Sequence, residues 1–256
     1  MASYRLRAQI GAKAVSGAIN GGECEIAVFN KPSAEDLELA KSLKASGKCV
    51  VVDFCDDHFS HPSLGSVYRD FLDIADRVVC NTEVMAQRIG RDCTVIPDPY
   101  ECMTVAPHAN GENLIWFGHS SNLQDIAKFS NLPNLTIVSG PKVIEGVRPW
   151  SKESIGGHLA NANICLLPTR EGAEYKSNNR FITAVMSGLF PVCNPHPAYT
   201  EFKGLAWLGC IGTGTRWALQ ERDSLNHLVA EMQWAIQAKY SPMIVGEQWK
   251  NLLESI

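Results

Sequence analysis

The sequence lacks any apolar run long enough to form a membrane-spanning helix. Its longest apolar stretches have the length of a β-strand, whereas a spanning helix needs about 18 apolar residues or more. No apolar core of a signal peptide follows Met1. We therefore expect a soluble, cytoplasmic protein with no spanning membrane segment.

An excess of positive charge is also missing. The 23 Lys and Arg residues are outnumbered by 27 Asp and Glu residues, which gives a net charge of −4. A protein that binds duplex nucleic acid or an anionic membrane normally presents a basic surface. We therefore expect no nucleic-acid partner, although a local pocket for a phosphate group is compatible with this charge.

Several catalytic and metal-binding motifs are absent as well. The nine cysteines are odd in number and form no C-x-x-C pair, which argues against a disulfide framework and against a zinc ribbon. The chain has no Walker loop, no G-x-S-x-G, no H-E-x-x-H and no EF-hand loop. These absences exclude the commonest hydrolase and metal-enzyme classes.

What the sequence does contain is an alternation of short apolar runs and amphipathic segments. This βαβ alternation is typical of a parallel sheet with right-handed crossovers. Ser33 with Asp36 predicts a capping box, and Thr82 predicts the cap of a further helix. The expected strands are 25–29, 49–52, 77–80, 94–96, 114–117, 135–138, 164–167 and 190–193. The expected helices are 33–45, 64–75, one that begins after Thr82, 122–129, 151–160, 179–187 and most of 217–256.

Residues 99–112 interrupt this alternation with two prolines, an Asn110-Gly111 pair and no apolar periodicity. The segment is the best linker candidate. It predicts an N-terminal domain of residues 1–108 and a C-terminal domain of residues 109–256 that ends in a helical tail. Two such α/β domains form a cleft, where open α/β sheets bind their ligands. Gly212-Thr213-Gly214 lacks the third glycine of a dinucleotide motif, so we expect a turn there.

The first candidate site begins where the apolar strand 49–52 ends. Asp53, Asp56, Asp57, His58 and His61 follow that strand, at the edge where parallel sheets place reactive side chains. Carboxylates beside an imidazole can act as a general base or bind sugar hydroxyls. The same residue types could instead hold a divalent metal, or the aspartates could serve only as turn residues.

Two further candidates follow strands in the second half. The strand that contains Trp116 runs into Gly118 and a helix start, where free backbone N–H groups suit a phosphate. A long polar loop, residues 168–180, also precedes a helix. In that loop Lys176 and Arg180, with the helix dipole, would balance the charge of a diphosphate. The plain alternative is a solvated surface loop with a few ion pairs.

Around this polar loop the sequence resembles the second domain of GT-B fold glycosyltransferases, in particular the family 4 sugar-nucleotide transferases. Those enzymes have a strand that ends in Pro-Ser, a Glu-Gly loop, a helix and a Gly-x-Pro-Val step. Other segments of this sequence resemble motifs of the first domain of those enzymes, and its opening resembles their Ser-x-Arg-x-Arg motif. The matching segments here are 167–169, 171–172, 184–188, 191–192, 74–83, 95–98, 114–118 and 3–7.

The resemblance implies an α/β fold of two Rossmann-like parallel-sheet domains that face a cleft, with a shortened acceptor-side N-terminal domain. It implies transfer of a sugar from a UDP- or GDP-linked donor, as substrate and with no cofactor, to an unknown glycan, lipid or small-molecule acceptor. It implies no metal, because side-chain cations would neutralise the diphosphate. The implied catalytic residues are Asp56, Asp57 and His58, and the implied donor-binding residues are Gly118, His119, Ser120, Glu171, Lys176, Asn179, Arg180 and Thr183.

Departures from the family pattern keep alternatives open. The family has two Glu residues eight positions apart, whereas the later position is Thr183 here, 12 residues after Glu171. Ribose binding would then pass to Glu174 or Asn179. The Arg and Lys that usually follow the first glycine turn are not evident after Gly118. A non-catalytic nucleotide-sugar-binding module is the main alternative, followed by a sugar-nucleotide epimerase and a metal enzyme.

Overall fold

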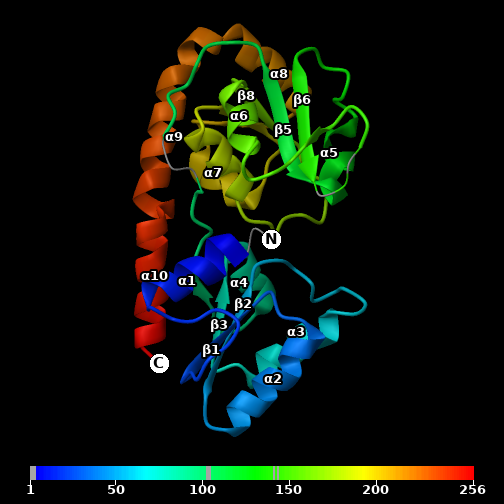
Figure 1. Ribbon diagram of the computed structural model, residues 1–256. Coiled ribbons are helices and arrows are strands. Elements are labelled where there is room, and N and C mark those ends of the chain that lie inside the picture. Colours follow the sequence, from blue (N-terminus) through cyan, green and yellow to red (C-terminus); the bar gives the residue numbers. More distant parts are fainter. Residues whose placement is uncertain (1–3, 102–104, 141, 143) are drawn as a thin grey trace. The chain divides into compact units, whose positions relative to one another are not determined.

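The computed structural model describes residues 4–101, 105–140, 142 and 144–256, so Ser3 of the Ser-x-Arg-x-Arg segment lies outside it. The chain divides into two compact units, whose elements Figure 1 labels. Unit 1 contains the described residues up to Pro99, together with Tyr175–Ser177 and Lys239–Ile256. Unit 2 contains the described residues of Tyr100–Glu174 and Asn178–Ala238.

Unit 1 is built on a parallel sheet with the strand order β1-β2-β3-β4. Its strands are β1 (Ile26–Asn30), β2 (Cys49–Phe54), β3 (Arg77–Cys80) and β4 (Thr94–Val95). The β-branched run Val50, Val51 and Val52 of β2 is fully buried. Such a run favours a strand that is covered on both faces.

Helices cover both faces of the unit 1 sheet. On one face, Phe54 packs in an apolar cluster with residues of α2 (Ala34–Ala45), α3 (Gly65–Ile74) and α4 (Glu83–Ile89). On the other, Val51 packs with Trp249 of α10 (Pro242–Glu254). The N-terminal segments η1 (Tyr4–Ala8, a π-helical turn) and α1 (Gln9–Ala14) join this second layer, since α1 contacts α10.

Unit 2 is built on a parallel sheet with the order β10-β9-β8-β5-β6-β7. From β5 the chain adds strands toward one edge, and from β8 it adds them toward the other, which is a doubly wound order. The strands are β5 (Leu114–His119), β6 (Leu135–Gly140), β7 (Arg148–Pro149), β8 (Ile164–Leu167), β9 (Phe190–Cys193) and β10 (Trp207–Leu208).

Short helices connect these strands and a long one follows them. Helices α7 and α8 pack against β8 and β9, while α5 packs against β5. The helices are η2 (Ser120–Asn122), α5 (Leu123–Ala127), α6 (Ile155–Ala160), α7 (Asn179–Met186), η3 (Pro197–Phe202), α8 (Ile211–Gln220), η4 (Arg222–Ser224) and α9 (Leu225–Tyr240). Nowhere in the described ranges is a helix long and apolar enough to cross a bilayer.

The main local expectations are confirmed. The capping box is formed, with the Ser33 N–H donating to Asp36 at 2.7 Å, and Thr82 accepts a hydrogen bond from the Met85 N–H at 3.1 Å. Every expected strand is present, with shifts of one or two residues at some ends. The two-residue strands β7 and β10 were not expected.

One local expectation differs from the structure. The turn expected at Gly212-Thr213-Gly214 is wrong, because these residues lie in the first turns of α8. Gly214 is needed there because the Trp207 ring fills the space that a Cβ would take. In the structure, α10 groups with unit 1, and the N-terminal stretch of unit 1 ends at Pro99. The apolar stripe of α10 is buried on the unit 1 sheet.

Candidate functional site

The strand order of the unit 2 sheet reverses between β5 and β8. These two strands pair only at Leu114 with Ile164 and at Ile115 with Cys165. Toward its carboxyl end, β5 stays paired with β6, while β8 stays paired with β9. The carboxyl side of such a reversal point is where open α/β sheets bind their ligands.

Trp116, Gly118 and Arg180 meet beside this point. The Arg180 guanidinium, in the first turn of α7, lies over the Trp116 ring at 5.9 Å from its centroid. A Cβ on Gly118 would lie 3.1 Å from the Trp116 ring and 3.3 Å from Arg180 Nη1. A side chain at position 118 would therefore press on two neighbouring side chains, a reason for glycine that the sequence did not reveal.

Arg180 is a half-buried cation that no acidic residue neutralises in the part of the chain that the structure describes. Within the described part of the chain it has no ion pair, and its Nη1 is withdrawn from solvent with no hydrogen-bond acceptor. The positive charge of Arg180 also acts on Cys165 of β8. Burial raises the pKa of Cys165 to about 12, and the charge of Arg180 opposes that rise. A cation left in this state loses solvation without compensation, so the position favours an anionic ligand.

The start of α7 adds more hydrogen-bond donors. Asn178 occupies the N-cap position, but its side chain caps no backbone N–H, and the first turn holds no acidic residue. The Nδ2 of Asn179 is buried and has no acceptor among the described residues. The first turn of α7 thus holds backbone N–H groups, an amide and a guanidinium, and no carboxylate. This combination suits a phosphate or a diphosphate.

Two further polar atoms near the reversal point were missed by the sequence analysis. Ser139 is the register partner of Gly118 on β6, and its hydroxyl is buried without a partner in the described structure. The Nε1–H of Trp116 is in the same condition. A serine directly after the apolar strand run 135–138 was the available signal, but only the strand register places it beside Gly118.

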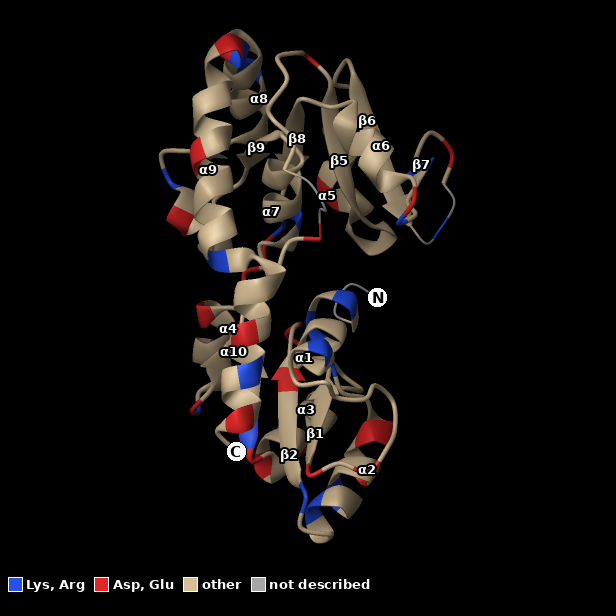
Figure 2. Cartoon of the chain, turned by 60° about the vertical axis from the view of Figure 1, so that its left-hand side comes forward, with Lys and Arg blue, Asp and Glu red and all other residues tan. Residues whose placement is uncertain are grey.

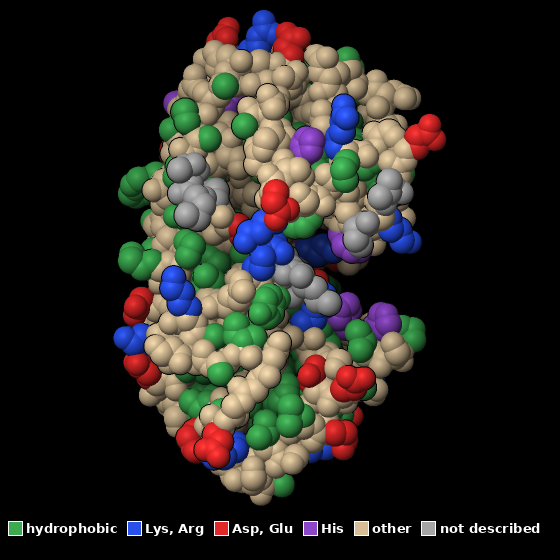
Figure 3. Space-filling model, viewed as in Figure 1, with side chains coloured by type: hydrophobic (Ala, Val, Ile, Leu, Met, Phe, Trp, Pro, Cys, Tyr) green, Lys and Arg blue, Asp and Glu red, His purple; other side chains and the backbone are tan. Residues whose placement is uncertain are grey.

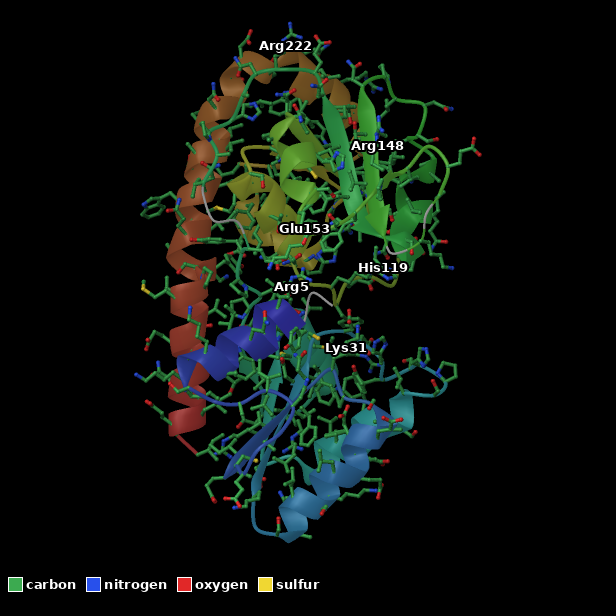
Figure 4. All side chains as sticks on the ribbon, in the orientation of Figure 1. Arg5, Lys31, His119, Arg148, Glu153 and Arg222 are labelled. Atoms are coloured by element: carbon green, nitrogen blue, oxygen red, sulfur yellow. The ribbon has the colours of Figure 1, made fainter. Side chains whose placement is uncertain are left out.

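The other predicted donor-binding residues of unit 2 have no buried polar side-chain atom that lacks a partner in the described structure. His119 ends β5, and Figure 4 labels it there. Its Nδ1 accepts a hydrogen bond from the Ser121 N–H at 3.2 Å and so caps η2. Ser120 is half-exposed at the start of η2, Glu171 is exposed on the polar loop, and Thr183 is half-buried on α7.

The polar loop contributes to both units. Arg170 ties its first part to unit 2, because Nη1 lies 3.6 Å from Oδ1 of the buried Asp125. Lys176 belongs to the segment Tyr175–Ser177, which groups with unit 1, where Tyr175 packs against the apolar core. The structure therefore does not gather Lys176 and Arg180 into one unit.

In unit 1, the aspartates that follow β2 are held by partners. Asp56 Oδ2 lies 2.6 Å from Lys31 Nζ, and both side chains are about equally exposed. Lys31 adopts a left-handed backbone with φ of 53° directly after β1, and Figure 4 marks its position. Asp57 accepts a hydrogen bond from the Phe59 N–H at 3.0 Å and pairs with Arg88 at 3.3 Å. Asp57 thus stabilises the turn and anchors α4.

His58 is the group in this segment best suited to proton transfer. It is half-buried, and burial lowers its pKa despite the opposing charge of Asp56. The imidazole is therefore neutral near pH 7 and can accept a proton. Its ring meets Tyr68 edge-on at 5.4 Å, and the Tyr68 hydroxyl is buried with no partner among the described residues.

Figure 2 shows acidic colouring at the arrowhead of β2. Asp53, near the carboxyl end of that strand, is part of a buried ion-pair network. It accepts hydrogen bonds from Arg7 Nε and Nη2, at 2.6 and 2.7 Å, and from Asn30 Nδ2 at 2.6 Å. Arg7 Nη1 donates to the Ile96 carbonyl and to Asp98. Burial would lower the pKa of Arg7, but the two carboxylates outweigh it and raise that pKa.

This network also bears on Asp53 as a candidate metal ligand. Because Asp53 is fully buried and committed to Arg7 and Asn30, it does not join His58 and His61 as a ligand. No group of three or more His, Cys, Asp or Glu side chains that could hold a metal ion occurs among the residues described. Figure 3 shows acidic and basic side chains interspersed on the visible face of each unit.

The sequence matches no protein-family model, and no curated protein is similar to it. Solved structures, however, have the same fold. The Anabaena protein Alr3699/HepE in complex with UDP-glucose matches with a TM-score of 0.70 at 12% identity, over 90% of this chain and 79% of that chain. The same protein with UDP matches with a TM-score of 0.68 at 12% identity, over 97% and 82% of the two chains.

An alpha-glucosyltransferase in complex with UDP-glucose and DNA containing an abasic site matches with a TM-score of 0.62 at 10% identity. It covers 96% of this chain and 84% of that chain. At such low identity the likeness concerns the fold. It confirms the expected α/β architecture, in which two Rossmann-like units, each with a parallel sheet, make up a GT-B-like chain.

Proposed function

We propose that this chain is a glycosyltransferase that moves a sugar from a nucleotide-sugar donor to an acceptor. The single observation that carries the proposal is the unneutralised, half-buried Arg180 at the start of α7, beside the strand-order reversal of unit 2. Support also comes from the fold, since its solved neighbours hold UDP-glucose or UDP. The short motifs around the polar loop favour family 4 among the GT-B transferases.

In this proposal the donor diphosphate binds at the start of α7. Arg180 and the Asn179 amide donate to its oxygens, and the backbone after Gly118, at His119 and Ser120, lies at the same sheet edge. As the bond between the sugar and the diphosphate breaks, negative charge grows on the leaving group. The fixed positive charge of Arg180 stabilises that charge, so it acts in the transition state. Lys176 is a second proposed cation, and Glu171 and Thr183 are proposed donor contacts.

On the acceptor side, His58 is the proposed general base. Its neutral imidazole would accept the proton of the acceptor hydroxyl that attacks the sugar. Asp56, held by Lys31, would keep negative charge near the imidazolium that forms. Asp57 would support the turn that carries both residues. We place the reaction in the cytoplasm, consistent with the free state of every described cysteine.

The second candidate is a nucleotide-sugar-binding module without catalysis. Thr183 favours it, because a neutral side chain stands on α7 where the family has a ribose-binding Glu. Both candidates predict nucleotide binding, and they differ in turnover.

Calorimetric titration with UDP, GDP, UDP-glucose and GDP-mannose tests the binding step. We expect at least one of these ligands to bind with micromolar affinity. Absence of binding at millimolar concentration would contradict both candidates. A nucleotide-release assay with the tightest donor then separates them: release of UDP or GDP above the rate without protein supports the transferase, and binding without release supports the module.

A further inference from the structure

Two cysteine thiols of unit 1 lie in direct contact at the end of β3. The sulfurs of Cys80 and Cys93 are 3.3 Å apart, and the thiol of Cys93 donates to the sulfur of Cys80. Helix α4 lies between the two residues in the sequence, so the contact joins the loop after α4 to the end of β3. Among the eight cysteines that the structure describes, no other pair has a sulfur–sulfur hydrogen bond.

The surroundings of the two sulfurs favour oxidation. A disulfide needs sulfurs about 2.05 Å apart, so a small movement of the loop closes the bond. Cys80 is fully buried, whereas Cys93 is partly exposed beside the exposed Asp92. A dissolved oxidant can therefore reach Cys93, while Cys80 is in place to react next. The hydrogen bond between the two thiols lowers the pKa of Cys80 and raises that of Cys93. Exposure therefore selects Cys93 for the reaction with the oxidant, and the lower pKa prepares Cys80 to close the bond, since a thiolate is the reactive form of cysteine.

We propose that Cys80 and Cys93 form a reversible redox-modification site, in which a peroxide converts the dithiol into an intramolecular disulfide. The Cys93 sulfur attacks one oxygen of hydrogen peroxide, the O–O bond breaks, water leaves and Cys93 becomes a sulfenic acid. The Cys80 sulfur then attacks the Cys93 sulfur. The S–S bond forms, the S–O bond breaks and a second water leaves with the remaining proton. The sulfurs lose two electrons and the peroxide gains them, and a dithiol such as dithiothreitol reverses the change.

The disulfide closes a ring that contains α4. Thr82 caps this helix at one end, and Arg88, near the other end, pairs with Asp57. A closed ring restricts the unfolded chain, so we expect oxidised protein to melt roughly 5 °C higher than reduced protein. The site belongs to unit 1 alone, and it does not depend on the function proposed for unit 2.

Peptide mapping of the full wild-type chain tests the proposal directly. The protein is treated with hydrogen peroxide, alkylated without reduction and digested with trypsin and a glutamate-specific protease. Because Glu101 lies between Cys93 and Cys102 in the sequence, this digestion separates those two cysteines. We expect a linked pair of peptides that contain Cys80 and Cys93, two hydrogens lighter than the reduced pair, and its loss after dithiothreitol. Full alkylation of Cys93 after peroxide, or a link from Cys80 to another cysteine, would overturn the proposal.

Variants give a second readout. Cys93→Ser should abolish both the linked peptides and the rise in melting temperature on oxidation. Cys49→Ser, which changes another partly exposed cysteine of unit 1, should leave both unchanged. The wild-type mapping remains decisive if Cys93→Ser folds poorly. A melting temperature that rises equally in Cys93→Ser would place the effect elsewhere and refute the site.

Discussion

The carboxyl edges of the two sheets differ in whether their polar side chains have partners. At the carboxyl edge of unit 1, charged side chains are paired with one another, as in Arg7 with Asp53 and Lys31 with Asp56. At the carboxyl edge of unit 2, Arg180 and Asn179 have buried donor atoms that meet no acceptor among the described residues. Paired charges stabilise a fold, whereas unpaired donors lower its stability unless a ligand satisfies them. The difference indicates that the paired charges at the unit 1 edge stabilise its fold, whereas the unit 2 edge leaves donor atoms available to an anionic ligand.

The largest effect on this comparison should come from Arg7→Met. The substitution leaves the carboxylates of Asp53 and Asp98 buried without their cation, so we expect a loss of about 3–5 kcal/mol in the free energy of unfolding. Chemical denaturation followed by circular dichroism measures it. The double variant Arg7→Met with Asp53→Leu should recover part of the loss, because the buried charge is then removed. Equal midpoints for wild type and Arg7→Met would mean that the paired edge does not hold unit 1 together.

Arg180→Gln should have the next largest effect, and on binding instead of folding. A charge-assisted hydrogen bond contributes about 1.5–3 kcal/mol, so the affinity for UDP or the tightest nucleotide should fall roughly 10- to 150-fold. The melting temperature should change little, because Arg180 has no ion pair among the described residues and loses only its contact with the Trp116 ring.

Arg170→Gln is the matched control for that variant. Arg170 is an arginine of the same polar loop, but it is paired with Asp125. We expect its substitution to change nucleotide affinity less than about threefold, because Asp125 already balances the charge of Arg170. Equal losses in Arg170→Gln and Arg180→Gln would show that general charge, and not the position of Arg180, governs binding.

Much of the fold follows from the sequence, because each main strand carries its own apolar signal. The run Val50, Val51 and Val52 is buried as expected, and the caps at Ser33 and Thr82 fix two helix starts. The two-residue strands β7 and β10 are too short to produce a pattern. The position of α10 was equally hidden, because the apolar stripe around Trp249 would fit the sheet of either unit.

The candidate site is only partly readable from the sequence. Arg180 and Gly118 stand out because each lies where a strand gives way to a helix. Ser139 and Trp116 look like ordinary members of apolar strands, and only the strand register and the ring over Gly118 bring them to the site. The roles of the predicted site residues stay predictions, and the comparison of the two edges ranks Arg180 first among them.

Gly118→Ala should have a moderate effect on unit 2. The new Cβ would lie 3.1 Å from the Trp116 ring and 3.3 Å from Arg180 Nη1, so the stack must shift by a few tenths of an ångström. We expect a loss of about 1 kcal/mol in stability and a several-fold loss of nucleotide affinity, measured by thermal melting and calorimetry. Gly156→Ala is the control, since that glycine of α6 has nothing within 4 Å of a Cβ and alanine favours a helix. If Gly118→Ala binds nucleotide like the wild type, the position of Arg180 beside Gly118 does not govern nucleotide binding.

The smallest predicted effect is a pH dependence that both units share. His58 of unit 1 and His108 of unit 2 are half-buried, and burial lowers the pKa of each, which for His108 outweighs the hydrogen bond between its Nδ1 and the Gly188 carbonyl. The unfolded chain, with an ordinary histidine pKa of about 6.5, then binds more protons than the folded chain below that pH. Stability is therefore full above about pH 6.5 and decreases as the pH falls toward the folded pKa values.

Melting temperatures of the wild type, His58→Gln and His108→Gln between pH 5.5 and 7.5 measure this dependence of stability on pH. Each variant should be less sensitive to acid than the wild type. The sensitivity of His108→Gln should be the lower of the two, because Nε2 of His108 is buried without a partner in the described structure. A wild-type melting temperature that rises on acidification would reverse the sign and contradict the burial argument for both histidines.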